Sequence, residues 1–381
     1  MATLELKLDR NTFASAVYKT QGVVDRKSTG NVLSNILIES IPSEDGGRVR
    51  LLGTDYDVTI EAEIPAEVLV EGAACINGKS LFDVIKNVDE NEVHLRALDN
   101  DWTEVISGRS QFKLAGITPG DFPEMKRPAD ITWLTIPKAT FRDLVDKTSF
   151  SMSDDETRMN LNGVFLRIQA GSSEGLSKLS MVSTDGHRLS KVEIEAELQG
   201  HDGSERTAII HKKGVQEVRR LLEGDSDSLD VGFSKGVILF RADGTTFTVR
   251  QIEDSYPDYG RVIPASSSIK ILAPRERLIR AIRRNAILTS SKTYIIKVEV
   301  TTGRLAVTTS NPDYGEGRDE VDVDYDGEGM VIGFNYTYLL DVLNVLKGET
   351  IALEMNDEFS PTVVTSPAEP GALFVVMPMR V

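Results

Sequence analysis

The chain has 381 residues, of which 40% are hydrophobic and 27% charged, and its formal net charge is −16 at pH 7. This composition is ordinary for a folded soluble protein of two to four domains, and no apolar run approaches the ~20 residues that cross a bilayer. A single cysteine, Cys75, excludes an internal disulfide and predicts a cytoplasmic or otherwise reducing location. If spread evenly, the acidic charge would also argue against nucleic acid, because DNA binding depends on phosphate contacts.

The chain repeats one order of predicted elements three times, at a spacing of roughly 125 to 135 residues that suits tandem small domains. Each repeat opens with a strand and a helix, and the helix is recognised by apolar residues at helical spacing. These residues are Phe13, Val17 and Tyr18, then Phe141, Leu144 and Val145, then Leu278, Ile279 and Ile282. A polar break follows each helix, at residues 25–30, 149–155 and 289–292.

Each repeat continues with an alternating strand, a second helix and a strand meander. The alternating strands, in which acidic residues stand between apolar ones, are at residues 58–64, 191–197 and 320–324. The second helices are predicted at residues 80–88, 213–222 and 336–346. Such a pattern is typical of an α+β domain in which helices cover one side of an antiparallel sheet. The sequence therefore predicts three domains, at residues 1–128, 129–262 and 263–381.

Charge is predicted to segregate between the sheets and the helices. The strand acids point away from the apolar face of each sheet, whereas bases gather on helices and in the breaks that follow them. A solvated helix face is the ordinary interpretation of such bases. Their recurrence in three repeats favours a basic surface that faces phosphates without reading sequence. The bases assigned to it are Arg26, Lys27, Arg142, Lys147, Lys212, Lys213, Arg219, Arg277, Arg280 and Arg284.

Hydrolase chemistry is suggested by two patterns, and neither has the geometry that it needs. Residues 171–175 match a nucleophile-elbow motif but join two predicted strands instead of a strand and a helix. Ser183, Asp185 and His187 lie around a bend at Gly186 between two strands. Side chains on one side of a strand point in parallel and cannot easily converge as nucleophile and base. A serine hydrolase that uses Ser183 and His187 is therefore only a remote alternative.

Nucleotide and metal binding are similarly weak hypotheses. Residues 78–80 read Gly-Lys-Ser before a helix, but the glycine that should open a phosphate loop is missing, and Ser80 is predicted to cap the helix instead. The four histidines lack metal-ligand spacing with a second ligand. The sequence predicts a protein that is not an enzyme and uses no cofactor or metal.

Short segments along the whole chain carry a specific resemblance. They are Ser107–Phe112, Asp121–Pro123, Leu161–Gly163, Thr184–Leu189, Tyr256–Tyr259, Arg261–Val262, Gly333–Asn335, Leu340–Leu343 and Val375–Arg380. In this order they are similar to the bacterial β sliding clamps, the processivity factors of the replicative DNA polymerase. The resemblance implies three clamp-fold domains per protomer and a homodimeric ring, with antiparallel sheets outside and helices lining a hole that encircles duplex DNA.

The resemblance also implies partners. They are the replicative polymerase, the clamp loader, and the repair and translesion proteins that carry clamp-binding motifs; the DNA is bound without regard to sequence, and no membrane is involved. A phage or accessory clamp of the same fold with different partners is the alternative. On this reading the basic surface faces DNA, with Arg26 or Lys27 in a loop that touches the duplex.

Site residues follow from the resemblance position by position. The protomer contact would set Phe112 and Leu114 of a first-domain edge strand against Ile287 and Leu288 of the other copy. The peptide cleft would lie between the second and third domains, with Arg188, Arg261 and Asn335 orienting the peptide. Its residues would be Leu161, Thr184, Gly186, His187, Arg188, Leu189, Pro257, Arg261, Val262, Asn335, Tyr338, Phe359, Pro361, Val375, Met377, Pro378 and Met379.

Overall fold

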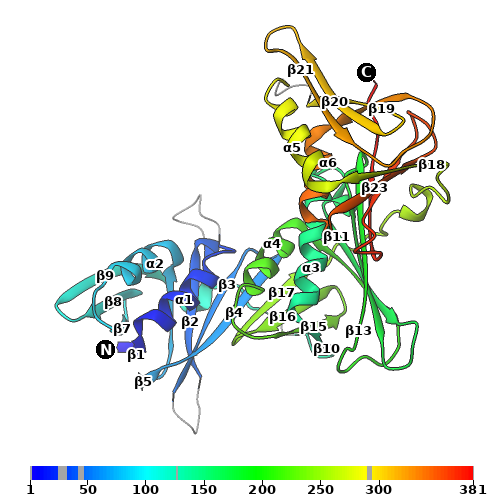
Figure 1. Ribbon diagram of the computed structural model, residues 1–381. Helices are drawn as coiled ribbons and strands as arrows, with labels where there is room; N and C mark the ends of the chain where they lie inside the picture. Colours follow the sequence, from blue (N-terminus) through cyan, green and yellow to red (C-terminus); the bar gives the residue numbers. More distant parts are fainter. Residues whose placement is uncertain (1, 25–31, 42–46, 126–127, 290–293, 381) are drawn as a thin grey trace. The chain divides into compact units, whose positions relative to one another are not determined.

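A computed structural model describes residues 2–24, 32–41, 47–125, 128–289 and 294–380. The described chain divides into two compact units, one formed by residues 1–139 and 216–251 and the other by 140–215 and 252–381 (Figure 1). The predicted α+β class is confirmed, because helices accompany sheets whose strands pair in antiparallel fashion. No helix among the described residues has the length and apolar character needed to cross a membrane.

Six α-helices occur in the described residues. They are α1 (Arg10–Thr20), α2 (Gly78–Asn87), α3 (Lys138–Thr148), α4 (Lys212–Leu221), α5 (Arg275–Ala286) and α6 (Tyr336–Val345). The cap predicted for α2 was wrong: Asn77, not Ser80, is the N-cap, and its Oδ1 accepts from the Ser80 amide at 3.0 Å. Gly78 packs tightly, since a Cβ there would lie 2.9 Å from Ile36 Cγ1. This contact favours a packed helix start over a phosphate cradle.

The first unit contains a 13-stranded sheet that spans two of the predicted repeats. In spatial order its strands are β10 (Thr132–Pro137), β15 (Ser228–Ser234), β16 (Val237–Ala242), β17 (Thr245–Arg250), β4 (Val58–Pro65), β3 (Arg48–Thr54), β2 (Asn35–Ile41), β6 (Ala73–Asn77), β9 (Ser110–Ile117), β8 (Trp102–Ser107), β7 (Glu92–Leu98), β1 (Ala2–Asp9) and β5 (Glu67–Val70). Strands β17 and β4 join the two repeats, with Phe247 opposite Ile60.

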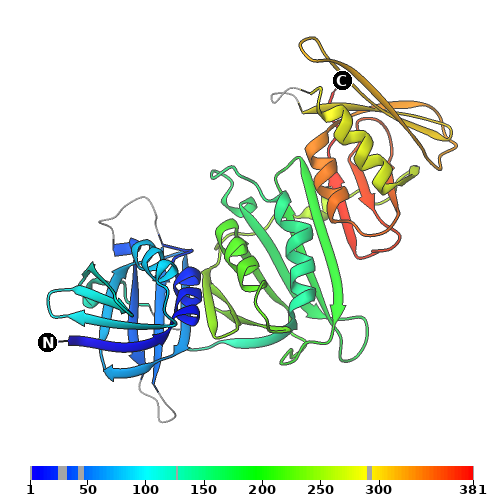
Figure 2. The same cartoon turned by 60° about the vertical axis from the view of Figure 1, so that its left-hand side comes forward.

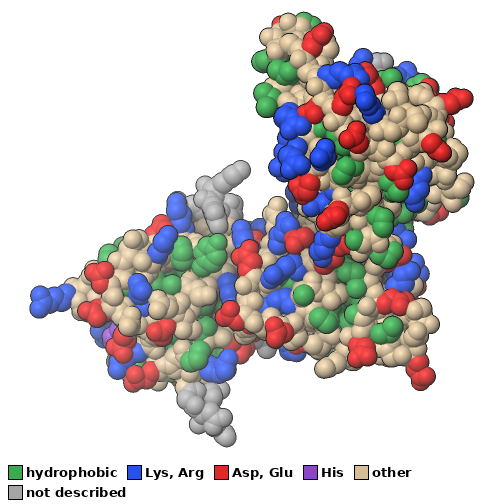
Figure 3. Space-filling view, in the orientation of Figure 1, with side chains coloured by type: hydrophobic (Ala, Val, Ile, Leu, Met, Phe, Trp, Pro, Cys, Tyr) green, Lys and Arg blue, Asp and Glu red, His purple; other side chains and the backbone are tan. Residues whose placement is uncertain are grey.

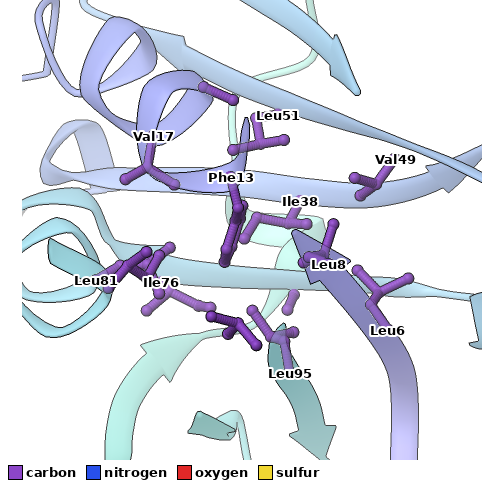
Figure 4. Packing of buried hydrophobic residues seen from close by; sticks show 14 of the residues in the cluster. Leu6, Leu8, Phe13, Val17, Ile38, Val49, Leu51, Ile76, Leu81 and Leu95 are labelled. Carbon is purple, nitrogen blue, oxygen red and sulfur yellow. The ribbon is translucent and has the colours of Figure 1, made fainter. Parts of the chain in front are cut away.

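Helices α1 and α2 close one core of the first unit, which is formed by side chains between residues 4 and 105 (Figure 4). Phe13 and Val17 of α1 and Leu81 of α2 are fully buried against side chains of the strands. The strand residues labelled beside them are Leu6, Leu8, Ile38, Val49, Leu51, Ile76 and Leu95. Burying each such side chain contributes about 1.5–3 kcal/mol, so this cluster is what holds the helices on one face of the sheet.

The second unit contains two sheets. The eight-stranded sheet has the order β14 (Arg206–His211), β11 (Gly163–Ala170), β12 (Ser177–Thr184), β13 (Arg188–Ala196), β25 (Ala372–Val376), β24 (Thr362–Thr365), β23 (Thr350–Met355) and β18 (Ile269–Pro274). The four-stranded sheet has the order β21 (Gly315–Asp322), β20 (Arg304–Asn311), β19 (Ile295–Thr301) and β22 (Met330–Asn335). Helices α5 and α6 lie side by side in both views (Figures 1 and 2).

Pairing of β13 with β25 joins the second and third repeats within this unit. Short 3₁₀ helices occupy the connections at η1 (Val32–Ser34), η2 (Pro119–Asp121), η3 (Ser149–Ser151), η4 (Met159–Leu161) and η5 (Tyr259–Arg261). The two compact units follow these joined sheets instead of the sequence repeats. The predicted limits of the three domains therefore stay a prediction.

Candidate functional site

The 184–188 bend connects β12 to β13 in the second unit. Gly186 has φ +90°, a conformation that strains other residues, so the predicted bend at this glycine is confirmed. The Asp185 carboxylate accepts from the amides of His187 and Arg188 at 2.9 and 3.0 Å. Thr184 Oγ1 donates to the Arg188 carbonyl at 2.7 Å. The bend is thus fixed by its own polar side chains.

Ser183 is not a nucleophile paired with His187. Its side chain is fully buried and its hydroxyl donates to the Thr148 carbonyl, whereas His187 is exposed. Residues 171–175 form the connection between the paired strands β11 and β12, as predicted, and not a strand-to-helix elbow. Neither serine pattern supports hydrolase chemistry.

The C-terminal segment lies beside the bend. In the β13–β25 pair Leu189 stands opposite Val375. Beyond β25 the Met377 amide donates to the His187 carbonyl at 2.9 Å, and the Met379 amide donates to the Gly333 carbonyl at 2.8 Å. Residues 377–379 therefore run from the edge of the bend to the four-stranded sheet, and this brings together residues far apart in the sequence.

The predicted cleft residues separate into buried and exposed groups. Leu161, Leu189 and Val375 are buried, and the last two belong to a cluster with Val182 and Val363. These side chains support the surface from beneath. Thr184, Arg188, Asn335, Tyr338, Pro361, Met377 and Pro378 are half-buried, and Gly186, His187, Pro257, Arg261, Val262, Phe359 and Met379 are exposed.

Three large apolar side chains in this group are available at the surface. Phe359 is 71% exposed, Val262 45% and Met379 36%. Asp357 presents Phe359, because its carboxylate accepts from the Phe359 and Ser360 amides at 2.8 and 2.7 Å. All three belong to the second unit, and exposed large apolar side chains are candidates for contact with a partner.

The polar residues predicted to orient a peptide have partners within the chain. Asn335 caps α6, and its Oδ1 accepts from the Thr337 amide at 3.0 Å. Arg261 is largely exposed and pairs with Asp258 at 2.9 Å. The Arg188 guanidinium is mostly buried and bonded on several sides.

Arg158 belongs to the same surface and was missed in the sequence. A Cβ on Gly186 would lie 3.1 Å from Arg158 Nη1, so this guanidinium lies against the bend. Arg158 also faces Asp155, with 3.6 Å between Nε and Oδ2. In the sequence Arg158 stands three residues before Leu161, a predicted cleft residue. That spacing does not indicate that Arg158 contacts residue 186.

Tyr256 packs beneath this surface. Its ring stacks on Phe165 with 5.2 Å between centroids, and burial raises the pKa of its hydroxyl. Tyr256 therefore acts as packing and stays protonated at neutral pH.

A basic helix face lies on α5. Arg277, Arg280 and Arg284 are exposed and line a hollow of about 190 Å³ together with Glu320 and Val321. Figure 3 shows Lys and Arg side chains gathered over this helix. Leu278 and Ile282 are buried on the opposite side, as predicted. Arg284 pairs with Asp319 of β21. The other two arginines that line the hollow, Arg277 and Arg280, have no carboxylate partner among the described residues.

The prediction that Lys147 faces DNA was wrong. Its side chain is 4% exposed, and Nζ lies 2.5 Å from Asp143 and 2.6 Å from Glu369. Although burial acts to raise the pKa of both carboxyls, hydrogen bonds from Lys147 and from Lys347 hold each pKa below its usual value. Lys147 belongs to an internal charge cluster, which is defined here as Lys147, Asp143, Glu369 and Lys347.

The other predicted bases differ in their surroundings. Arg142 and Arg219 are exposed, while Lys212 and Lys213 are half-buried. Lys212 pairs with Asp154, one of the acids of the 154–156 loop. Arg26 and Lys27 lie outside the described residues.

The predicted protomer contacts are surface features in each unit. Phe112 is 39% exposed and Leu114 is half-buried on β9. On one side β9 pairs with β8 along its length, but on the other its pairing within the described part of the chain is with β6 at residues 116 and 117. Ile287 is 76% exposed at the end of α5, and Leu288 is half-buried.

Three sequence profiles match the chain in order. They are the N-terminal domain of the DNA polymerase III beta subunit over residues 4–126, its central domain over 135–258 and its C-terminal domain over 260–380. The beta sliding clamp of Caulobacter vibrioides is 34% identical over 380 residues, covering 99% of this chain and 100% of that protein. The clamp of Escherichia coli is 30% identical with the same coverage.

Solved structures agree with these matches. The C. crescentus beta sliding clamp superimposes with a TM-score of 0.92 at 32% identity and covers 99% of each chain. The DNA polymerase III subunit beta of Pseudomonas aeruginosa superimposes with a TM-score of 0.90 at 29% identity, covering 99% of this chain and 100% of that chain.

Proposed function

The chain belongs to the bacterial β sliding clamp family, and from this premise we propose which of its surfaces hold DNA, a second protomer and partner peptides. Clamps of this family are non-catalytic processivity subunits of DNA polymerase III. The described residues present no nucleophile and base in catalytic geometry at the Ser183–His187 bend. The relatives found are bacterial clamps, so the phage or accessory alternative is not favoured.

The peptide surface is formed by the 184–188 bend, the 377–379 segment and the exposed apolar side chains of the same unit. The observation that carries this assignment is the bond of the 377–379 segment to the fixed bend at His187, with Met379 exposed on that segment and Phe359 and Val262 exposed in the same unit. An apolar or aromatic peptide side chain would bury area against these groups, and thioethers adapt to varied partners. The partners proposed are the replicative polymerase, the clamp loader, and repair and translesion proteins with clamp-binding motifs.

The ring is proposed to close through β9 of one protomer and the α5–β21 region of its partner. The open edge of β9 at residues 110–115 and the exposed Phe112 and Ile287 support this contact, because an uncovered edge strand otherwise invites unregulated pairing. The α5 arginines are proposed to face duplex DNA, together with Arg142, Lys212, Lys213 and Arg219.

The domains are proposed to divide at 128/129 and 262/263, which the profile matches support.

A peptide titration tests the assigned surface. Phe359→Asp and Met379→Asp place charges where apolar contact is proposed, and each is expected to weaken binding of a fluorescent polymerase clamp-binding peptide about tenfold or more. Glu328→Gln, an exposed change on the same unit, is the control and should bind as the unsubstituted protein does. Unchanged affinity in both Asp variants would place the peptide elsewhere.

A further inference from the structure

The Arg188 guanidinium connects three parts of the second unit. Its Nε donates to Asp185 in the bend at 3.0 Å, and its Nη1 donates to Asp341 of α6 at 2.6 Å. Its Nη2 donates to the Phe150 carbonyl in η3. The Tyr338 ring of α6 lies 4.3 Å from its Cζ and the Phe150 ring 5.5 Å. One side chain thus holds the bend, α6 and η3 together.

These partners leave Arg188 little to offer a ligand. Its side chain is 12% exposed, and the Asp185 carboxylate that it holds is 15% exposed. A peptide carboxylate that pairs with the guanidinium at Nη1 would compete with Asp341, which is 40% exposed but bonded at 2.6 Å. Charge-assisted hydrogen bonds to a mostly buried guanidinium are costly to break, because the guanidinium loses its partner.

We infer that the Arg188 guanidinium is a positioning group of the peptide surface and not a charged partner of the peptide. The inference rests on the proposed peptide-binding function. Arg188 ties the bend to α6 and so fixes the position of His187 relative to Tyr338. The 377–379 segment is fixed with it, because the Met377 amide donates to the His187 carbonyl. A lysine could not replace it, because a single ammonium cannot reach three acceptors in a planar fork and does not stack in the same way.

The role of Asp341 separates a positioning residue from a contact residue. If Arg188 positions the surface, removing its α6 partner must also weaken peptide binding. If Arg188 contacts the peptide, Asp341→Ala frees the guanidinium, and affinity stays the same or rises. The variants are Arg188→Ala, Asp341→Ala and the double substitution, titrated with the fluorescent polymerase peptide; Asp313→Ala removes an exposed carboxylate of the β20–β21 turn as the control.

Positioning predicts that Asp341→Ala lowers affinity several-fold and Arg188→Ala about tenfold. The double variant should be no weaker than Arg188→Ala alone, since both changes open the same connection. Asp313→Ala should bind like the unsubstituted protein. Unchanged or tighter binding by Asp341→Ala, or losses that simply add in the double variant, would overturn the inference.

The Arg188→Lys variant separates positioning of the peptide surface from a general contribution to stability. This variant keeps the positive charge, and we expect it to remain folded by thermal melting while still binding the peptide several-fold more weakly. Full recovery of affinity by lysine would overturn the inference. Failure of the unsubstituted protein to bind the peptide would instead reject the proposed function, so the two failures are distinguishable.

Discussion

Helices α3 and α5 both carry bases that the sequence assigned to one DNA-facing surface, yet their environments differ. On α5, Arg277, Arg280 and Arg284 lie at the surface around a hollow. On α3, Lys147 is buried between two carboxylates. The comparison teaches that a basic residue on a helix is available to phosphates only where its partners and its helical phase leave it exposed.

Helical phase explains much of the difference. Leu144 and Thr148 are buried on α3, and Lys147 lies between them, three residues after Leu144. It therefore falls within the buried stripe, where an ammonium must find carboxylates. The α5 arginines instead lie on the side opposite Leu278 and Ile282.

The largest effect is expected from Lys147→Ala. Removing this ammonium leaves the Asp143 and Glu369 carboxylates without their buried partner, and breaking a buried pair costs about 3–5 kcal/mol. Urea unfolding of the variant should show this loss in the free energy of unfolding. The control is Lys347→Ala in the same cluster: its side chain is 68% exposed, so about 0–1 kcal/mol is expected. Equal losses in the two variants would contradict the assignment of Lys147 as the internal cation.

Substitutions on α5 are expected to change DNA binding without changing thermal stability. Substituting Arg277, Arg280 and Arg284 together with alanine should reduce the salt dependence of binding to a short duplex, by up to about 0.9 in log–log slope for each phosphate contact removed. Thermal melting should change little, because exposed side chains contribute little to folding. A salt slope identical to that of the unsubstituted clamp would remove α5 from the DNA-facing surface.

A smaller, pH-dependent effect is expected from the charge cluster. The pKa values of Asp143 and Glu369 are lowered in the folded state, so their stabilising contribution is present above their unfolded pKa values of about 4 and is lost as pH falls through the lowered folded values. Acid unfolding should therefore become less steep in the Asp143→Asn and Glu369→Gln variants. An acid profile with the original slope in both variants would show that other carboxylates dominate.

Local patterns predicted the antiparallel sheets, the helices and the bend at Gly186, because alternation, helical spacing and glycine placement act over a few residues. The partners of the charged side chains were beyond such reasoning. Lys147 meets Glu369 across 222 positions and Arg188 meets Asp341 across 153, so only the folded chain brings them together. The cleft residues inferred from the resemblance all belong to the second unit. Leu189 and Val375 are buried beneath the proposed peptide surface, whereas Phe359 and Met379 are exposed on it.

The most direct measurement of the central claim, a ring that holds DNA by encircling it, is retention on DNA of defined topology. The clamp is loaded by its clamp loader onto nicked circular DNA, the DNA is cut once, and bound protein is followed by gel filtration. We predict stable retention on the circle and rapid loss from the linear ends. Equal retention on circular and linear DNA would contradict the account, because it would mean that local contacts hold the protein.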